Sequence, residues 1–255
     1  MARCLSVTSV NERRGIVFSV FKRELRAMLC GYRAYTFIAV FSICYLAVRM
    51  IYNYILLYDN IYGFMNHEYI LMLLPAAFAF AVPVLTFSMY SEERTNNVFS
   101  FLRSLPLSNR DVFFGKYLSR FALFGATYAV MLVVDVVLGA FGGAPIFTVM
   151  YSVLCYILIA AVMLSMNIFL ATVIKNKYLA LGVSYGISAI LTVLTVTRYS
   201  MPRLLCEIIE PISIFGTYTT AVFGAVDIVY IFLWLSLSAL FTYLSYVFIK
   251  KEIRL

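Results

Sequence analysis

Few side chains in this 255-residue chain are placed to do catalysis. His67 is the only histidine, and it belongs to no HExxH motif and to no serine–base pair. The five cysteines are scattered without a CxxC pair, so the sequence predicts neither a metal site nor a disulfide framework. Gly115 and Lys116 form a GK pair, but no Ser or Thr follows it, so it is not a GxxxxGKS/T phosphate-binding loop. We therefore expect the chain not to be an enzyme by itself.

Arg49 and Asp135 are the candidates for an intramembrane charge pair, because both lie within strongly apolar stretches. A charge at membrane depth costs about 3 kcal/mol unless it finds a partner or reaches the headgroups. A rise of about 1.5 Å per residue puts both residues toward the outer face at similar heights. Two alternatives stay open: the side chains pair across two helices, or each one reaches the outer headgroups alone.

A second polar pattern lies between residues 178 and 197. Ser184, Ser188 and Thr192 recur every fourth residue and share one face of a helix. These hydroxyls either line a pathway for a polar cargo or bond back to their own helix. Gly182 and Gly186 form a GxxxG pair, which permits close helix packing either within the chain or against a second protomer.

Segment 91–116 is the one long polar break inside the chain. Its several Arg and Lys residues predict a cytoplasmic position by the positive-inside rule. Pro106 ends a short helix whose apolar residues either fill a groove on a partner protein or rest on the membrane surface. These apolar residues are Val98, Phe99, Phe101, Leu102 and Leu105.

The composition predicts an all-α polytopic membrane protein. The chain is 64% hydrophobic and 13% charged, with a mean hydropathy of +0.94, which leaves too few polar groups to cover a soluble protein of this size. The net charge of +8 comes from basic residues beside apolar stretches. Membrane topology explains that distribution, so no nucleic acid partner is expected.

The chain divides into a cytoplasmic tail, 1–15, an interfacial amphipathic helix, 16–33, and a single six-helix transmembrane domain, 34–255. In the interfacial helix an apolar stripe that runs from Val17 through Phe18 to Leu29 is flanked or opposed by charged residues, which suits a helix lying at the inner membrane surface. The residues that we expect to matter there are Phe21, Lys22, Arg23, Leu25 and Arg26.

Apolar runs of about 20 residues predict six membrane spans. Pro75 and Pro83 fall in the second span and predict that it is bent or broken. Segment 198–226 is too polar to span and too apolar for a simple loop, so we expect a re-entrant extracellular segment before the sixth span. Lys and Arg concentrate on the side of both termini, which predicts cytoplasmic termini. The expected spans are 35–57, 69–90, 117–140, 148–174, 178–197 and 227–249.

Segment 91–116 resembles the region between the second and third spans of type-2 ABC transporter permeases, the membrane-spanning subunits of ABC exporters. The family pattern there has the form E-E-R-x-x-G-T-x-E-x-L, followed by a proline and a GK pair. Asn97 and Val98 replace the usual Gly and Thr, and Ser100 replaces the second Glu, which removes any salt bridge made by that glutamate. The interfacial helix, the six spans and the outer re-entrant segment are also similar to this family, so the resemblance covers nearly the whole chain. The matching residues are Glu92, Glu93, Arg94, Leu102, Pro106, Gly115 and Lys116.

The resemblance implies a half-transporter in a prokaryotic cell membrane. A second copy of the chain, or a homologous permease, would complete the pathway within the lipid bilayer. Two separate ATPase subunits would bind ATP and Mg, and this chain would bind no cofactor. They would dock on segment 91–116 and on the interfacial helix. The substrate stays unspecified: an amphipathic molecule, a peptide or a lipid.

Two other classes fit the residues less well. An ion-coupled secondary transporter or channel is the alternative, but such proteins carry several ionisable groups at mid-membrane and an inverted repeat. Only Arg49 and Asp135 come near that requirement. A membrane enzyme would need a catalytic set at membrane depth, and the sequence contains no recognisable one.

Overall fold

The computed structural model describes residues 17–59, 67–87, 89, 109–137, 146–197, 218 and 228–254. Its regular structure is helical, and these residues include no strand. An N-terminal helix, Val17–Cys30, precedes the long helices and makes an angle of 69° with the following stretch, Ala34–Ala47. The long helices are α2 (Tyr32–Asp59), α3 (His67–Thr86), α6 (Asn109–Val137), α7 (Ile146–Val173), α8 (Lys177–Thr197) and α11 (Ile228–Arg254).

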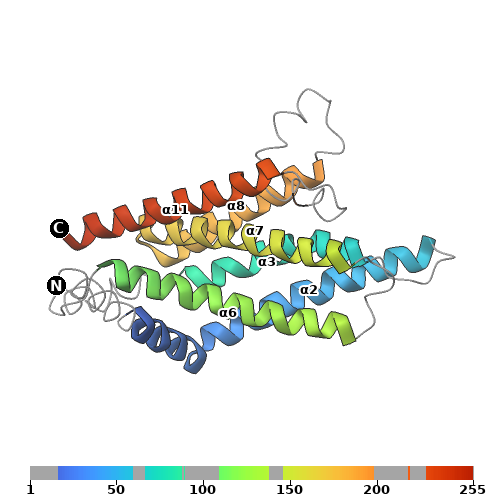
Figure 1. Cartoon of the computed structure of the whole chain (residues 1–255), viewed down its shortest axis with the longest axis horizontal. Helices are drawn as coiled ribbons and strands as arrows, with labels where there is room; N and C mark the ends of the chain where they lie inside the picture. Colours follow the sequence, from blue (N-terminus) through green and yellow to red (C-terminus); the bar gives the residue numbers. More distant parts are fainter. Residues whose placement is uncertain are drawn as a thin grey trace, which may run out of the picture.

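The long helices lie side by side and alternate in direction along the longest axis of the molecule (Figure 1). Each overlaps with one of the stretches predicted from the apolar runs. Among the described residues, three stretches are long and apolar enough to cross a membrane, and the bent pair formed by the N-terminal helix and the start of α2 would be a fourth. An integral membrane protein fits this all-helical architecture. The three stretches are Val153–Val173, Lys177–Leu194 and Ile228–Lys251.

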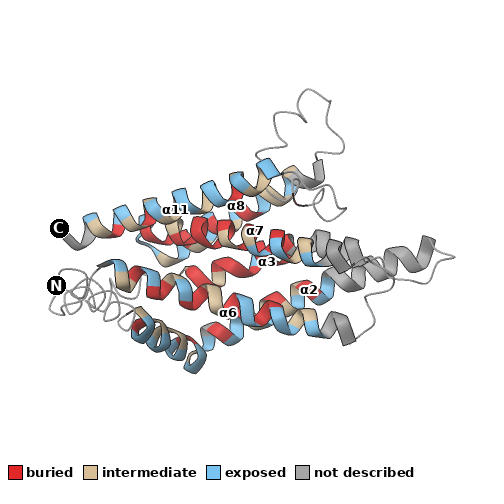
Figure 2. Cartoon of the chain, viewed as in Figure 1, coloured by how far each residue is buried: buried red, intermediate tan, exposed pale blue. Residues whose placement is uncertain are grey.

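Helix α7 is the centre of the bundle. It packs against α11 on one side and α3 on the other, and α3 in turn packs against α2 and α8. Buried residues concentrate on α7 and on the helix faces turned toward it, whereas α8 and α11 expose much of their length (Figure 2). The exposed positions of α11 are themselves apolar, as in Phe232 and Leu240. Lipid tails cover such a surface without the penalty that water would impose.

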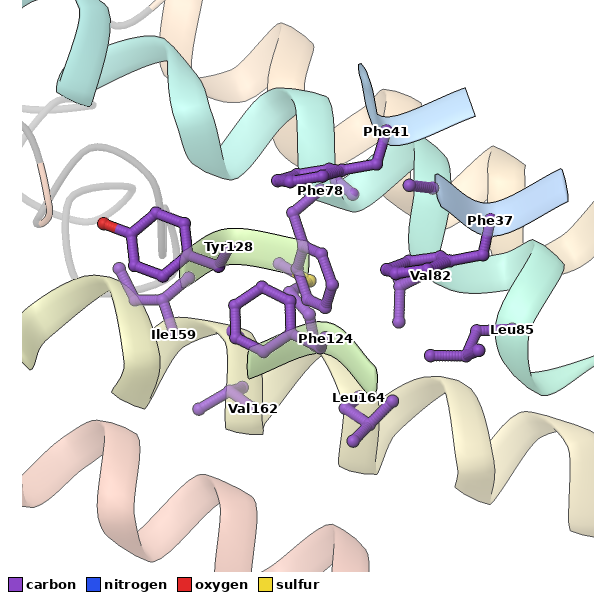
Figure 3. Packing of buried hydrophobic residues seen from close by; sticks show 14 of the residues in the cluster. Phe37, Phe41, Phe78, Val82, Leu85, Phe124, Tyr128, Ile159, Val162 and Leu164 are labelled. Carbon is purple, nitrogen blue, oxygen red and sulfur yellow. The ribbon is translucent and has the colours of Figure 1, made fainter. Parts of the chain in front are cut away.

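An aromatic cluster joins four helices around Phe78 of α3 (Figure 3). The Phe78 ring lies 4.4 Å from Phe124 of α6 and 6.4 Å from Tyr156 of α7, measured between ring centroids. Phe37 and Phe41 of α2 meet Phe78 edge to face at 6.4 and 6.2 Å. Such ring pairs add about 0.5–1.5 kcal/mol each beyond the area they bury. This cluster connects α6 to the rest of the bundle.

The structure bears on two predictions about helix ends. Of the two alternatives for the second span, bent or broken, a break is excluded over the described residues, because α3 continues through Pro75 and Pro83 from His67 to Thr86. The helix that contains the third expected span begins before residue 117, since α6 starts at Asn109. Residues 109–116 of segment 91–116 are therefore the first two turns of a helix. Asp111 in the first turn favours that start, because a carboxylate is stabilised by the positive end of the helix dipole.

Segment 198–226 is represented among the described residues by Tyr218 alone. Its side chain is fully buried, and its ring lies 6.2 Å from that of Tyr156 on α7. Burial of this side chain against the bundle fits the expected re-entrant segment, whose path otherwise lies outside the described residues. The 1–15 tail also lies outside them.

Candidate functional site

The candidate site is the contact between the N-terminal helix and the start of α6. Both elements lie at the end of the bundle where α7 and α11 also finish (Figure 1). Basic residues lie at this end on the N-terminal helix, α6 and α11, among them Lys116 and Lys250, and Lys175 follows the end of α7. The site therefore combines a helix-to-helix contact with a concentration of positive charge.

Gly115 sets the distance between the two helices. A Cβ atom at this position would lie 2.7 Å from Val20 Cγ1 and 3.3 Å from the backbone nitrogen of Phe21. Real Cβ atoms do not approach another atom to 2.7 Å, and Val20 is β-branched with little rotamer freedom in a helix. Only glycine permits this approach. Gly115 of the GK pair is thus the point of contact with the N-terminal helix.

The N-terminal helix presents one stripe to the protein and another to its surroundings. Val20 and Met28 are buried, and Phe21, Glu24 and Leu25 are half-buried on the same stripe. Of the expected apolar stripe, Met28 is thus buried against the protein, whereas Phe18 is 64% exposed and Leu29 is also exposed. The exposed side carries Lys22, Arg23 and Arg26 beside these two apolar residues. Apolar and cationic side chains together suit a membrane surface with anionic headgroups.

Glu24 is the electrostatic centre of the contact. Its side chain is 15% exposed and is attracted to Lys116 and Arg120, whose residues are only 1% and 3% exposed. Burial alone would raise the pKa of the Glu24 carboxyl. The attraction of Lys116 and Arg120, with a smaller contribution from Arg23, outweighs burial and holds this pKa below its ordinary value.

Hydrogen bonds fix the positions of these charged groups. Arg23 Nη2 donates to Glu24 Oε1 at 3.1 Å. Arg120 Nη1 donates to the Lys116 carbonyl oxygen at 2.8 Å, and Ser119 Oγ donates to the same oxygen at 2.8 Å. A buried cation is tolerated only when it is paired and hydrogen-bonded. Glu24 therefore neutralises charge that α6 has taken out of water.

Sequence reasoning missed Glu24 and Arg120 as members of this site. From the sequence, Glu24 is one of the charged residues that flank or oppose the apolar stripe. A signal was present, because Val20, Glu24 and Met28 are four residues apart and so share one helix face. A single acid on such a face indicates a cationic partner. Which residues are the partner cannot be read from the sequence, because Lys116 and Arg120 lie more than 90 residues further along the chain.

The two sequence patterns of α8, the hydroxyl stripe and the glycine pair, lie on opposite faces of the helix. Ser184 and Ser188 are buried on the side where α8 contacts α3 and α7, and Thr192 Oγ1 donates to the Ser188 carbonyl oxygen at 2.8 Å. Gly182 and Gly186 are exposed, and a Cβ atom at either would meet no atom within 4 Å. The glycine pair is thus not used for packing within the described chain.

The side chains of the remaining expected site residues lie outside the part of the chain that the structure describes. Arg49 lies on α2 and Asp135 on α6, but their side chains are not described, so the charge pair stays a prediction. The expected ATPase-docking residues of segment 91–116 lie outside the described residues. These are Glu92, Glu93, Arg94, Val98, Phe99, Phe101, Leu102, Leu105 and Pro106.

No model of a known protein family matches this chain, and a comparison with curated proteins gives no match. Within the described ranges, no group of three or more His, Cys, Asp or Glu residues could hold a metal ion. What the geometry offers is a close contact between two helices, made by Gly115 and by the attraction of Glu24 to Lys116 and Arg120.

Proposed function

We propose that the chain is the membrane-spanning permease subunit of an ATP-driven ABC exporter. The observation that carries the proposal is the contact between the N-terminal helix and the start of α6. The family resemblance assigns ATPase docking to segment 91–116 and to the interfacial helix. The part of segment 91–116 that the structure describes, residues 109–116, is fastened to the N-terminal helix through Gly115.

The proposed topology has six spans with both termini in the cytoplasm. Each long helix has at least 20 residues, which corresponds to about 30 Å, the thickness of the hydrocarbon core. Their alternating directions bring the start of the N-terminal helix and the end of α11 to the same end of the bundle. Basic residues concentrate at that end, as the positive-inside rule requires of the cytoplasmic side.

In the proposed mechanism the ATPase subunits bind ATP with Mg and move segment 91–116 as they close. The start of α6 then moves together with the N-terminal helix, because the Gly115 contact and the Glu24 cluster hold them as one unit. Phe124 of α6 transmits this motion to Phe78 of α3 at the aromatic cluster. A movement of the ATPase subunits outside the membrane would thus shift the helices packed around α7.

The second permease would pack on the outward face of α8. Gly182 and Gly186 are exposed there beside Ile190 and Val193, so a partner helix could approach the backbone closely. The buried serines lie on the opposite side of the same helix. In this proposal the small residues serve assembly and the hydroxyls serve packing within the chain.

Isoleucine at both glycines is expected to break this dimer without unfolding the subunit. The added side chains enter open space in one chain but collide with a helix packed against it. We expect the free energy of dimer association to weaken by about 1–2 kcal/mol, which raises the dimer dissociation constant roughly tenfold. Native mass spectrometry of the Gly182→Ile, Gly186→Ile variant measures it. Gly125→Ile on exposed α6 is the matched control and should keep the dimer. An unchanged dimer in the double variant would argue against the α8 interface.

The function is tested by tagging the chain, extracting it gently from its native membrane and identifying by mass what accompanies it. We expect a stoichiometric soluble partner with a P-loop and vanadate-sensitive ATP hydrolysis in the same sample. A chain that comes out alone and inert, under conditions that preserve known complexes, would contradict the proposal. It would favour an ion-coupled secondary transporter or channel, and Arg49 and Asp135 would be the next residues to test.

Aspartate at both Phe99 and Phe101 is expected to weaken the association with the ATPase about tenfold or more, because aromatic anchors dominate such interfaces. Copurification of the tagged variant measures the loss, and membrane insertion should be unchanged. Tyr178→Asp, at an exposed aromatic position at the start of α8, is the control outside the segment. Undiminished copurification of the ATPase with the double variant would remove these phenylalanines from the docking surface.

A further inference from the structure

A groove runs between α6 and α11 on the side of the bundle. It has a volume of about 490 Å³ and is lined by Arg110, Phe114 and Tyr117 from α6 and by Ser238, Thr242 and Tyr246 from α11, among others. The groove exists because α11 packs chiefly on α7 and touches α6 at few points. A space of this size falls within the range of small-molecule sites in proteins.

The groove is elongated along the helix axes. The lining residues follow the helical repeat, so each helix contributes one face. They are 110, 114 and 117 on α6, and 238, 239, 242, 243 and 246 on α11. At about 1.5 Å per residue, the stretch from Ser238 to Tyr246 extends about 12 Å. One leaflet of the hydrocarbon core is about 15 Å deep. The groove, about 12 Å long, can therefore hold most of an acyl chain that extends through one leaflet.

Positive charge marks the end of the groove at the start of α6. Arg110 is the second residue of that helix and is exposed. Its Nε donates to the Tyr246 hydroxyl at 3.1 Å, and its guanidinium carbon lies 5.7 Å from the Tyr246 ring centroid. Lys250 follows Tyr246 by one helical turn on the same face of α11. The lining contains no carboxylate, since Asp111, the neighbour of Arg110, is not part of it.

The interior of the groove is apolar despite its hydroxyl groups. Thr242 Oγ1 donates to the Ser238 carbonyl oxygen at 2.7 Å, and Ser238 Oγ donates to the Leu235 carbonyl oxygen at 2.9 Å. These donors are engaged by their own helix, so they compete little for a ligand. Phe114 and Tyr243 are exposed along the rim, which opens the groove sideways to the membrane.

We propose that this groove binds one anionic glycerophospholipid from the leaflet at the basic end of the bundle. The phosphate lies at Arg110 and one acyl chain lies along the rings between α6 and α11. Charge complementarity selects an anionic headgroup, and the elongated apolar interior selects a tail. Basic pockets between membrane helices are typical sites for such headgroups. The proposal requires that the chain spans a membrane, and it does not depend on an ATPase partner.

Native mass spectrometry of the full-length chain, titrated with dioleoyl-phosphatidylglycerol or dioleoyl-phosphatidylcholine, tests the site. We expect one phosphatidylglycerol per chain to bind in preference to phosphatidylcholine. Arg110→Gln should weaken that binding about fivefold, whereas Lys175→Gln, at an exposed cation of the same end, should not. Ala239→Phe fills the groove and should weaken binding to a similar extent, whereas Leu240→Phe, outside the groove, should not.

Three outcomes would overturn the proposal. Equal affinity for the two lipids would show that the headgroup charge does not matter. An Arg110→Gln variant that binds phosphatidylglycerol as tightly as the wild type would show that Arg110 does not hold the phosphate. Full displacement of the lipid by inorganic phosphate, together with unchanged binding by Ala239→Phe, would make the groove a small-anion site. An unchanged thermal unfolding temperature in each variant verifies that loss of binding is not loss of folding.

Discussion

Glu24→Gln is expected to release the N-terminal helix from α6. The substitution keeps the shape of the side chain but removes the negative charge, which leaves Lys116 and Arg120 buried without it. Breaking a buried charge cluster in this way costs about 2–3 kcal/mol. Amides of residues 17–30 should then exchange with deuterium roughly 30 to 150 times faster than in the wild type, because the helix undocks more often.

The pH dependence of this effect follows from the lowered pKa of Glu24. Its ordinary value is 4.5, and a carboxyl whose pKa is lower in the docked state stabilises docking fully above that value. This stabilisation is lost as the pH falls through the lowered pKa. The difference in thermal stability between Glu24→Gln and the wild type should therefore be largest near pH 7 and shrink below pH 4.5. Equal stability of the two proteins at pH 7 would contradict the role of this charge cluster.

Asp111→Asn is the matched control for Glu24→Gln. It removes a carboxylate from the same end of α6, but Asp111 does not contribute to the lowered pKa of Glu24. We expect only the small loss, about 0.3–1 kcal/mol, that is typical of an acid at a helix N-terminus. In the assembled transporter that we propose, Glu24→Gln should also reduce transport per ATP hydrolysed, because the two docking elements no longer move together.

Gly115→Val is expected to push the two helices apart by a steric effect. The new Cβ atom would lie within 3.3 Å of the Phe21 backbone nitrogen, and a backbone atom cannot rotate away. Overpacking of this kind costs about 3 kcal/mol. Gly125→Val makes the same change on an exposed part of α6, where a Cβ atom meets nothing within 4 Å. Exchange of residues 17–30 should rise in Gly115→Val and stay unchanged in Gly125→Val.

A compensating change separates the steric effect from a loss of folding. Gly115→Ala brings its methyl group closest to Val20 Cγ1 at 2.7 Å, and Val20→Ala removes that atom. The double variant Gly115→Ala, Val20→Ala should therefore recover part of the protection that Gly115→Ala loses. If the double variant loses as much protection as the two single changes combined, the Gly115 contact does not control docking.

The positions of the long helices could be predicted from the sequence. The fifth expected span, 178–197, agrees with α8 to within one residue, and the fourth, 148–174, agrees with α7 to within two. This success has a local cause, since a run of about 20 apolar residues must satisfy its own backbone hydrogen bonds wherever it sits in a membrane. The sequence left open whether the prolines bend or break α3. The helix continues through both, because a packed helix accommodates proline.

What only the tertiary structure decided is how each helix is turned. The sequence placed Ser184 and Ser188 on one face of a helix and established the GxxxG pair, but it did not assign either to the inside. Packing against α3 and α7 buried the serines and left Gly182 exposed. In the same way, the stripe of the N-terminal helix included Glu24 because α6 brought Lys116 to it. Helical spacing is a property of neighbours in sequence. The face that is buried depends on contacts between residues far apart in the chain, and these exist only after the helices have packed.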